Sequence, residues 1–129
     1  MDRLLRGSRR TAALALICVG LACAHRRGAD RFTEPEDVVL AVTNHHFVDV
    51  TIYVEHDGQR TRVGTVTAAS TERFRVPWRL LSASRQFHLR GDVIGSSEIV
   101  RTETLTIQPG QHIEWTLEHD LQRSSVGVF

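Results

Sequence analysis

The segment from residue 48 to residue 65 constrains the fold of this chain most. Apolar residues occupy every second position from Val48 to Val54, and mostly polar residues lie between them. A period of two is typical of a strand with one buried face. Asp57-Gly58 follows, and these residue types accept the positive φ angles of a tight two-residue turn. The segment therefore predicts a β-hairpin.

The turn also fixes a register for this hairpin. Four cross-strand pairs follow from it: His56 with Gln59, Glu55 with Arg60, Tyr53 with Arg62, and Ile52 with Val63. One face receives Val50, Ile52, Val54, Thr61, Val63 and Thr65. The other face receives an ion pair and a tyrosine–arginine contact, each worth a fraction of a kcal/mol where exposed. The first face is the predicted buried side.

Six further segments have the composition of short strands. They are residues 38–42, 71–76, 86–90, 99–107, 113–117 and 125–129. Residues 77–84 predict one helical turn with proline at its first position and with Trp78, Leu80 and Leu81 over the core. No long helical period interrupts these segments.

Residues 99–107 and 113–117 flank Pro109-Gly110 and are expected to pair as a second hairpin. A loop centred on Gly110 pairs Ile107 with Ile113, and Leu105 with Trp115. A shorter loop would slip the register by one residue and invert the burial of a whole strand. The longer loop is therefore predicted.

Strands at this spacing predict an all-β domain over residues 37–129. We expect a single antiparallel β-sandwich of about seven strands, of immunoglobulin-like or transthyretin-like type. A small β-barrel is the alternative.

The first 22 residues have the pattern of a bacterial export signal. Four arginines precede a short apolar run from Ala12 to Leu21, which ends in small residues. That run is too short to cross a bilayer as a helix, which needs about 20 apolar residues. Residues 1–22 are thus a predicted signal peptide, and the charged residues 23–36 a predicted flexible tether.

Cys23 directly follows Gly-Leu-Ala at the end of this run and resembles the lipidated cysteine of a bacterial lipoprotein. The other cysteine of the sequence, Cys18, lies within the predicted signal peptide. Lipidation of Cys23 would therefore leave the exported domain without a free thiol. The alternative is cleavage after Ala24, which leaves His25 first. Lipidation predicts a cell-envelope protein attached to a membrane, with the outer membrane favoured. The alternative predicts a soluble periplasmic or secreted protein.

Charge argues against a nucleic-acid partner. Without residues 1–22 the chain loses four of its 16 basic residues and one of its 15 acidic residues, so the net charge falls from +1 to −2 (12 − 14). A basic nucleic-acid-binding surface therefore finds no support in the bulk charge.

The predicted exported part of the chain resembles other proteins in two stretches, VTNHHFVDVTIYVEHDGQRTRVGTV and LTIQPGQHIEWTLEHDL. They resemble small uncharacterised secreted or lipid-anchored β-sandwich proteins of environmental bacteria. The shared features are structural: alternating apolar residues, Asp-Gly and Pro-Gly turns, and a tryptophan expected to be buried. The resemblance implies no catalytic residues.

The sequence contains no motif of an enzyme. G-x-S-x-G, H-E-x-x-H, C-x-x-C and a phosphate-binding glycine loop are all missing. Glu114 and Glu118 alternate with Thr116, which is typical of the solvated face of a sheet. We therefore predict a non-catalytic protein without a cofactor.

Recognition by a sandwich usually resides in its loops, and residues 44–47 and 91–97 are the expected ones. The first loop contains the candidate binding residues Asn44, His45, His46 and Phe47. Among the aromatic residues Phe47 is the best candidate for exposure, although closing the core is its favoured role. The expected partner is an envelope protein, a peptide or a glycan. The alternative function is periplasmic metal binding through His45 and His46, which could share one ion only from a loop.

Overall fold

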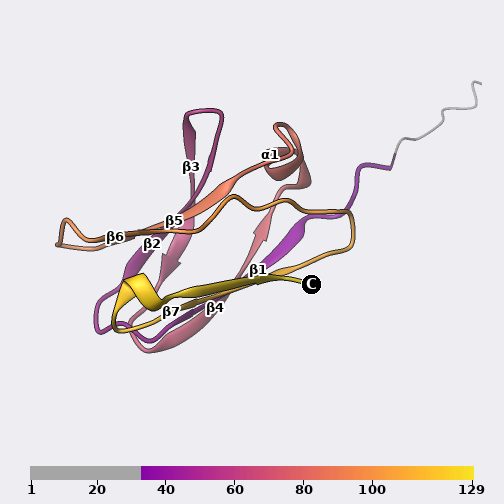
Figure 1. Cartoon of the computed structure of the whole chain (residues 1–129). Helices are drawn as coiled ribbons and strands as arrows, with labels where there is room; N and C mark the ends of the chain where they lie inside the picture. Colours follow the sequence, from indigo (N-terminus) through magenta and orange to yellow (C-terminus); the bar gives the residue numbers. More distant parts are fainter. Residues whose placement is uncertain (1–32) are drawn as a thin grey trace, which may run out of the picture. The chain divides into compact units, whose positions relative to one another are not determined.

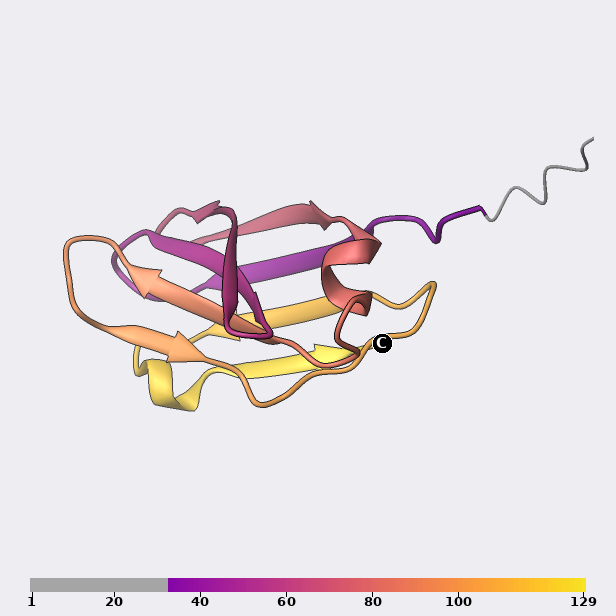
Figure 2. The ribbon, with the colours of Figure 1, turned by 90° about the horizontal axis from the view of Figure 1, so that it is seen from above.

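Two four-stranded sheets packed face to face make up the domain (Figures 1 and 2). The computed structural model describes residues 33–129. The elements in chain order are β1 (Val38–Asn44), β2 (Val50–His56), β3 (Gln59–Val66), β4 (Ser70–Val76), α1 (Trp78–Ser82), β5 (His88–Val93), β6 (Ile99–Arg101), β7 (Ile113–Leu117), the 3₁₀ turn η1 (Leu121–Arg123) and β8 (Ser125–Val128). The predicted signal peptide, Cys23 and most of the predicted tether lie outside the described residues.

The first sheet has the strand order β4-β1-β7-β8 and the second has the order β3-β2-β5-β6. The predicted β-sandwich is confirmed, and the alternative barrel is wrong because the two sheets do not close on each other. Residues 33–129 form eight strands, and the expectation of purely antiparallel pairing fails at one place. β1 and β7 run parallel, with Leu40 beside Ile113 and Asn44 beside Leu117.

The core lies between the sheets and is built from alternate residues of β1, β2, β5 and β7. Trp115 and Phe87 are the largest of the fully or almost fully buried side chains. α1 covers one end of this core with Leu81, as the sequence predicts, and Trp78 and Leu80 pack beside it (Figure 2). Among the described residues, no helix is long and apolar enough to span a membrane.

The hairpin of β2 and β3 follows the predicted register only next to its turn. Asp57 and Gly58 both have positive φ angles, at 47° and 74°, and the pairing agrees as far as Tyr53 with Arg62. Beyond that pair the register shifts by one, so that Ile52 lies opposite Gly64 and not Val63. Because of this β-bulge, the residues of β3 that face the core differ from those predicted.

The bulge changes which side of β3 faces the core. Beyond the bulge, Thr65 lies opposite Thr51 on the outer face, whereas Val66 is buried. On the turn side of the bulge, Thr61 keeps its predicted position opposite Val54 but is exposed. A bulge inserts one residue into a strand and so reverses the alternation beyond it. It allows Val66 to reach the core from the far end of β3.

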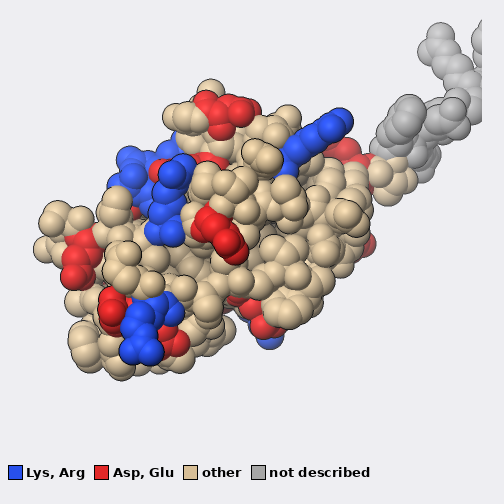
Figure 3. All heavy atoms as spheres, viewed as in Figure 1, with Lys and Arg blue, Asp and Glu red and all other residues tan. Residues whose placement is uncertain are grey.

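The outer face of the second sheet carries a network of ion pairs. Arg101 Nε donates to Glu55 Oε2 at 2.7 Å, and Arg90 Nη1 lies 3.5 Å from Glu55 Oε1. Arg90 Nε also donates to Asp92 Oδ1 at 2.6 Å, and this hydrogen bond is the main cause that raises the pKa of Arg90 above its ordinary value. Figure 3 shows the arginine cluster over β2 and β5.

Glu55 and Tyr53 have their predicted cross-strand neighbours, Arg60 and Arg62, but the side-chain contacts expected from those pairs differ. Arg60, and not Arg62, lies over the Tyr53 ring, 4.8 Å from its centroid, and its Nη1 is 3.7 Å from Asp92 Oδ2. Arg62 instead donates to Thr65 Oγ1 at 3.0 Å. Long arginine side chains reach diagonal neighbours on a sheet, which strict opposite pairing does not anticipate.

The predicted hairpin around Pro109-Gly110 is wrong. Of the predicted strand at residues 99–107, only Ile99–Arg101 forms a strand, β6, which pairs with β5 in the second sheet. The other predicted partner, β7, pairs with β1 and β8 in the first sheet. The turn itself is present, because Gly110 has a φ of 86° and Gln111 N–H donates to Gln108 O at 3.1 Å. It lies on the crossing between the two sheets.

Strand β5 also extends further than predicted. It continues through Gly91 to Val93, so the loop expected at residues 91–97 begins at Ile94. Gly91 is an inward position of this strand. A Cβ there would lie 2.8 Å from Val50 Cγ1 and 2.9 Å from Val100 Cγ1. Val50 and Val100 therefore pack so close to position 91 that only glycine fits there without displacing them.

We expect Gly91→Ala to lower the free energy of unfolding by about 1–3 kcal/mol, the usual cost of overpacking. Val100→Ala should relieve part of that cost, so the double variant should be more stable than the sum of the single losses predicts. Urea denaturation of the three variants measures this coupling. Strictly additive losses would contradict the proposed contact.

Candidate functional site

One end of the sandwich is formed by residues 45–49, which connect β1 to β2. Asn44, the last residue of β1, is fully buried and organises this loop. Its Nδ2 donates to Val48 O at 3.0 Å and to Thr67 O at 3.2 Å, and its Oδ1 accepts from His46 N–H at 2.9 Å. A buried amide with its donors and acceptor satisfied fixes the backbone around it.

His46 reinforces the same loop. Its side chain is nearly buried, and Nδ1 accepts from Val48 N–H at 3.3 Å. This bond assigns the proton of the neutral ring to Nε2, which faces Glu98 Oε2 at 3.6 Å. A further bond, from Ile94 N–H to Asp49 O at 3.0 Å, joins the loop to the one that follows β5. The two loops thus form one connected surface.

Phe47 projects from this rigid loop into solvent. Its side chain is 75% exposed, so the favoured expectation that it closes the core is wrong. Its ring stacks on the ring of His119, with centroids 4.6 Å apart and planes 21° apart. The His46 ring also contacts the Phe47 ring, with centroids 5.6 Å apart and planes tilted by 49°. Such ring pairs contribute about 0.5–1.5 kcal/mol each and orient the exposed phenyl group.

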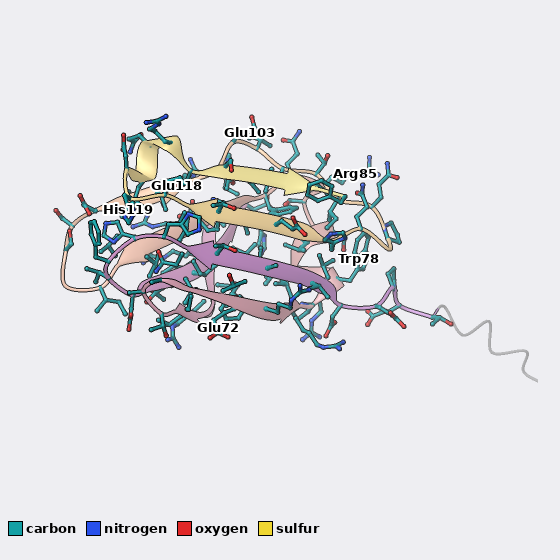
Figure 4. All side chains as sticks on the ribbon, turned by 90° about the horizontal axis from the view of Figure 1, so that it is seen from below. Glu72, Trp78, Arg85, Glu103, Glu118 and His119 are labelled. Carbon is teal, nitrogen blue, oxygen red and sulfur yellow. The ribbon has the colours of Figure 1, made fainter. Side chains whose placement is uncertain are left out.

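The parallel pairing of β1 and β7 explains why His119 lies here. Because the two strands run in the same direction, their carboxyl ends lie side by side at the same end of the sheet. There His45 N–H donates to Leu117 O at 2.8 Å. His45 Nδ1 then lies 3.2 Å from Glu118 Oε2. Figure 4 shows Glu118 and His119 at this end and Trp78 and Arg85 at the other.

We call this region the loop-end surface. Its apolar part consists of Phe47, Val48, Ile94 and the His119 ring, and its polar rim of His45, Glu98, Glu118 and Asp120. A shallow hollow of ≈ 470 Å³, lined by Glu118, His119, Asp120 and Arg123, adjoins the ring pair. Asp120 caps η1 by accepting from Gln122 N–H at 3.1 Å, which fixes the wall of the hollow.

The four residues predicted for this loop therefore have different roles. Asn44 and His46 are buried and hold the loop, whereas His45 and Phe47 are exposed and available for contact. His119 was not predicted, since nothing in its local sequence shows that β7 ends beside β1. From the second predicted loop, Ile94 contributes an exposed side chain and the neighbouring Glu98 a carboxylate.

The two histidines of the loop do not converge. His45 faces Glu118, and His46 faces Glu98 with its other nitrogen occupied by a backbone N–H. Within residues 33–129, no group of three or more His, Cys, Asp or Glu side chains is placed to hold a metal ion. The geometry of these residues gives the metal-binding alternative no support.

Comparisons with known proteins add little to this picture. No protein-family model matches the chain, and no curated protein sequence matches it. Among solved structures it resembles the NMR structure of a protein from Eubacterium rectale, at 18% identity and a TM-score of 0.43, over 73% of this chain and 87% of that one. A likeness at this level assigns neither a family nor a function.

Asn44→Ala should loosen the loop and destabilise the domain. It leaves the Val48 and Thr67 carbonyls and the His46 N–H without their side-chain partner, and unpaired buried groups cost about 1–3 kcal/mol each. We expect a loss of at least about 2 kcal/mol in urea denaturation, together with faster hydrogen exchange at His46.

Thr43→Ala is the matched control, because it removes an exposed hydrogen bond to Thr71 at the adjacent position. It should cost about 1 kcal/mol or less and leave exchange at His46 unchanged. Equal effects of the two variants would show that Asn44 does not organise the loop.

Proposed function

We propose that the protein is a non-catalytic binding module of the bacterial cell envelope, attached to a membrane by a lipid on Cys23. Its loop-end surface recognises an envelope protein, a peptide or a glycan. One observation carries the proposal: Phe47 is 75% exposed on a loop that the buried Asn44 holds in place. An aromatic side chain that is already ordered loses little entropy when a partner covers it.

The distribution of exposed apolar residues supports this surface over others. Of the five large exposed hydrophobic residues among residues 33–129, three belong to it: Phe47, Val48 and Ile94. Covering a fully exposed phenylalanine contributes about 1.5–3 kcal/mol. The acidic and histidine rim around these residues resembles the polar border of a recognition surface.

The position of the proposed tether is consistent with this role. The tether leads into β1 at Val38, and the loop leaves β1 at Asn44, so the strand separates them by roughly 20 Å. The loop-end surface and the entry of the tether therefore lie at opposite ends of the domain (Figure 1). Attachment through Cys23 would leave the loop-end surface accessible.

Photocrosslinking in living cells tests the proposal. A photoreactive phenylalanine analogue at position 47 should give a discrete adduct, of a protein, a peptide or a glycan. The same analogue at Arg85, exposed at the opposite end, should give several-fold less. Equal labelling at both positions, or none at position 47, would contradict recognition by the loop-end surface.

Lipidation is tested separately by the intact mass of the protein recovered from its host. A mass that begins at Cys23 and includes acyl chains supports the attached form. A chain that begins at His25 without added mass would contradict it and leave a soluble form of the binding module.

A further inference from the structure

A sandwich of two open sheets has four edge strands, and three of them here carry features that block pairing with another chain. β4 presents Glu72, Arg73 and Arg75. β3 presents Arg60 and Arg62, followed by the bulge.

β6 has only three residues, and the chain then leaves the ladder. At that point Thr102 Oγ1, in place of a backbone carbonyl, accepts from Leu89 N–H at 2.9 Å. Beyond it, residues 103–107 pair with β5's side of the sheet only through the isolated bridge between Leu105 and Phe87. An irregular edge of this kind offers no continuous row of backbone groups to a second strand.

β8 is the exception. Residues 125–129 read Ser-Val-Gly-Val-Phe, with no charged residue, no proline and no bulge. The strand pairs regularly with β7, and the pairing continues past it through two bonds of 3.0 Å between the backbones of His112 and Phe129. Within residues 33–129, no strand pairs with the other side of β8.

The direction of its free backbone groups follows from the ladder. His112 and Phe129 exchange both of their bonds, and in an antiparallel pair such positions recur every second residue. Residues 125, 127 and 129 thus direct their N–H and C=O groups to β7. Val126 and Val128 direct theirs away from it, along the open edge of the sheet.

We propose that two copies of this chain pair through β8, antiparallel, about a two-fold axis at Gly127. The sequence Val-Gly-Val is symmetric about that residue. Val126 then lies opposite the partner's Val128, and each such pair exchanges both of its N–H···O bonds. All the free groups of the edge find partners in one arrangement.

Gly127 suits the position on the axis. There it meets Gly127 of the partner subunit as a non-hydrogen-bonded pair, where the Cα atoms approach to about 4.5 Å. A Cβ at Gly127 would lie 2.6 Å from Phe129 Cε2, so the Phe129 ring lies over this glycine. That ring is 61% exposed and also stacks on His112 at 5.5 Å. In the pair, the two rings lie over adjoining strands and cover each other's exposed sides.

The same operation on another edge would be repulsive. An axis at Arg73 of β4 places two guanidinium groups opposite each other, and an axis at Arg62 of β3 does the same. Like charges directly opposite destabilise strand pairing. Self-pairing is therefore specific to β8.

Space next to β8 also fits a second copy. A hollow of ≈ 390 Å³ lies between the edges of the two sheets, lined by Val126 with Val100, Trp115 and Leu121 among its apolar residues. Val126 and Val128 point toward the core. The partner's Val128, which lies beside Val126 in the proposed pair, points its side chain toward this hollow.

Matched variants at position 126 test the proposal. Val126→Pro removes a backbone N–H that faces the open edge and leaves the bonds to β7 intact, and proline is tolerated at such positions. Val126→Ala loses similar packing but keeps the N–H. Sedimentation over a range of concentrations should show a dimer for the wild type and Val126→Ala, and an at least tenfold higher dissociation constant for Val126→Pro. The protein is used as recovered from the cell, in detergent micelles if it carries lipid.

Hydrogen exchange in the wild type gives a second readout that needs no variant. The amides of Val126 and Val128 should exchange at least tenfold more slowly at concentrations where the dimer forms, while those of β4 do not change. A wild type that stays monomeric to about 1 mM, a weak-binding limit, would overturn the proposal, even if β8 accepts a strand of another protein. Dimers of Val126→Pro as stable as those of Val126→Ala would also overturn it.

Discussion

Burial of alternate side chains between two sheets is the constraint on which the rest of this structure depends. Leu40, Ile52 and Trp115 each occupy an inward position and are almost completely buried. The same alternation in β1 ends at Asn44, which is inward and polar. Because a buried amide must satisfy its hydrogen bonds, Asn44 binds the backbone around it and orders the adjoining loop. The candidate site is thus a direct extension of the core pattern.

The periodic features of the sequence predict much of this fold. Alternation located most of the strands, and Asp57-Gly58 located the hairpin turn, because both depend on local backbone geometry. Alternation gives the face of a strand but not its neighbour, which is why residues 99–107 were paired with the wrong strand. The bulge in β3 escaped prediction for a related reason: it is favoured by the position of Val66 in the core, which no local pattern reveals.

The candidate site was only half predictable. The segment from Asn44 to Phe47 could be chosen as a loop between two strands, but the exposure of Phe47 depends on how the ends of β1 and β7 meet. His119 stacks on Phe47 only because these strands are parallel neighbours, a property of sheet order that joins residues far apart in the chain. Sheet order is set by the packing of the whole domain.

The two proposals make compatible demands on the molecule. Antiparallel pairing through β8 directs the two loop-end surfaces in opposite directions and keeps both away from the axis at Gly127. With a strand spacing of about 4.8 Å and the observed register, the two Val38 residues lie roughly 30 Å apart. Residues 23–36 can extend to at most about 50 Å. Both tethers could therefore reach one membrane, and the paired domains would lie along it with a recognition surface exposed at each end.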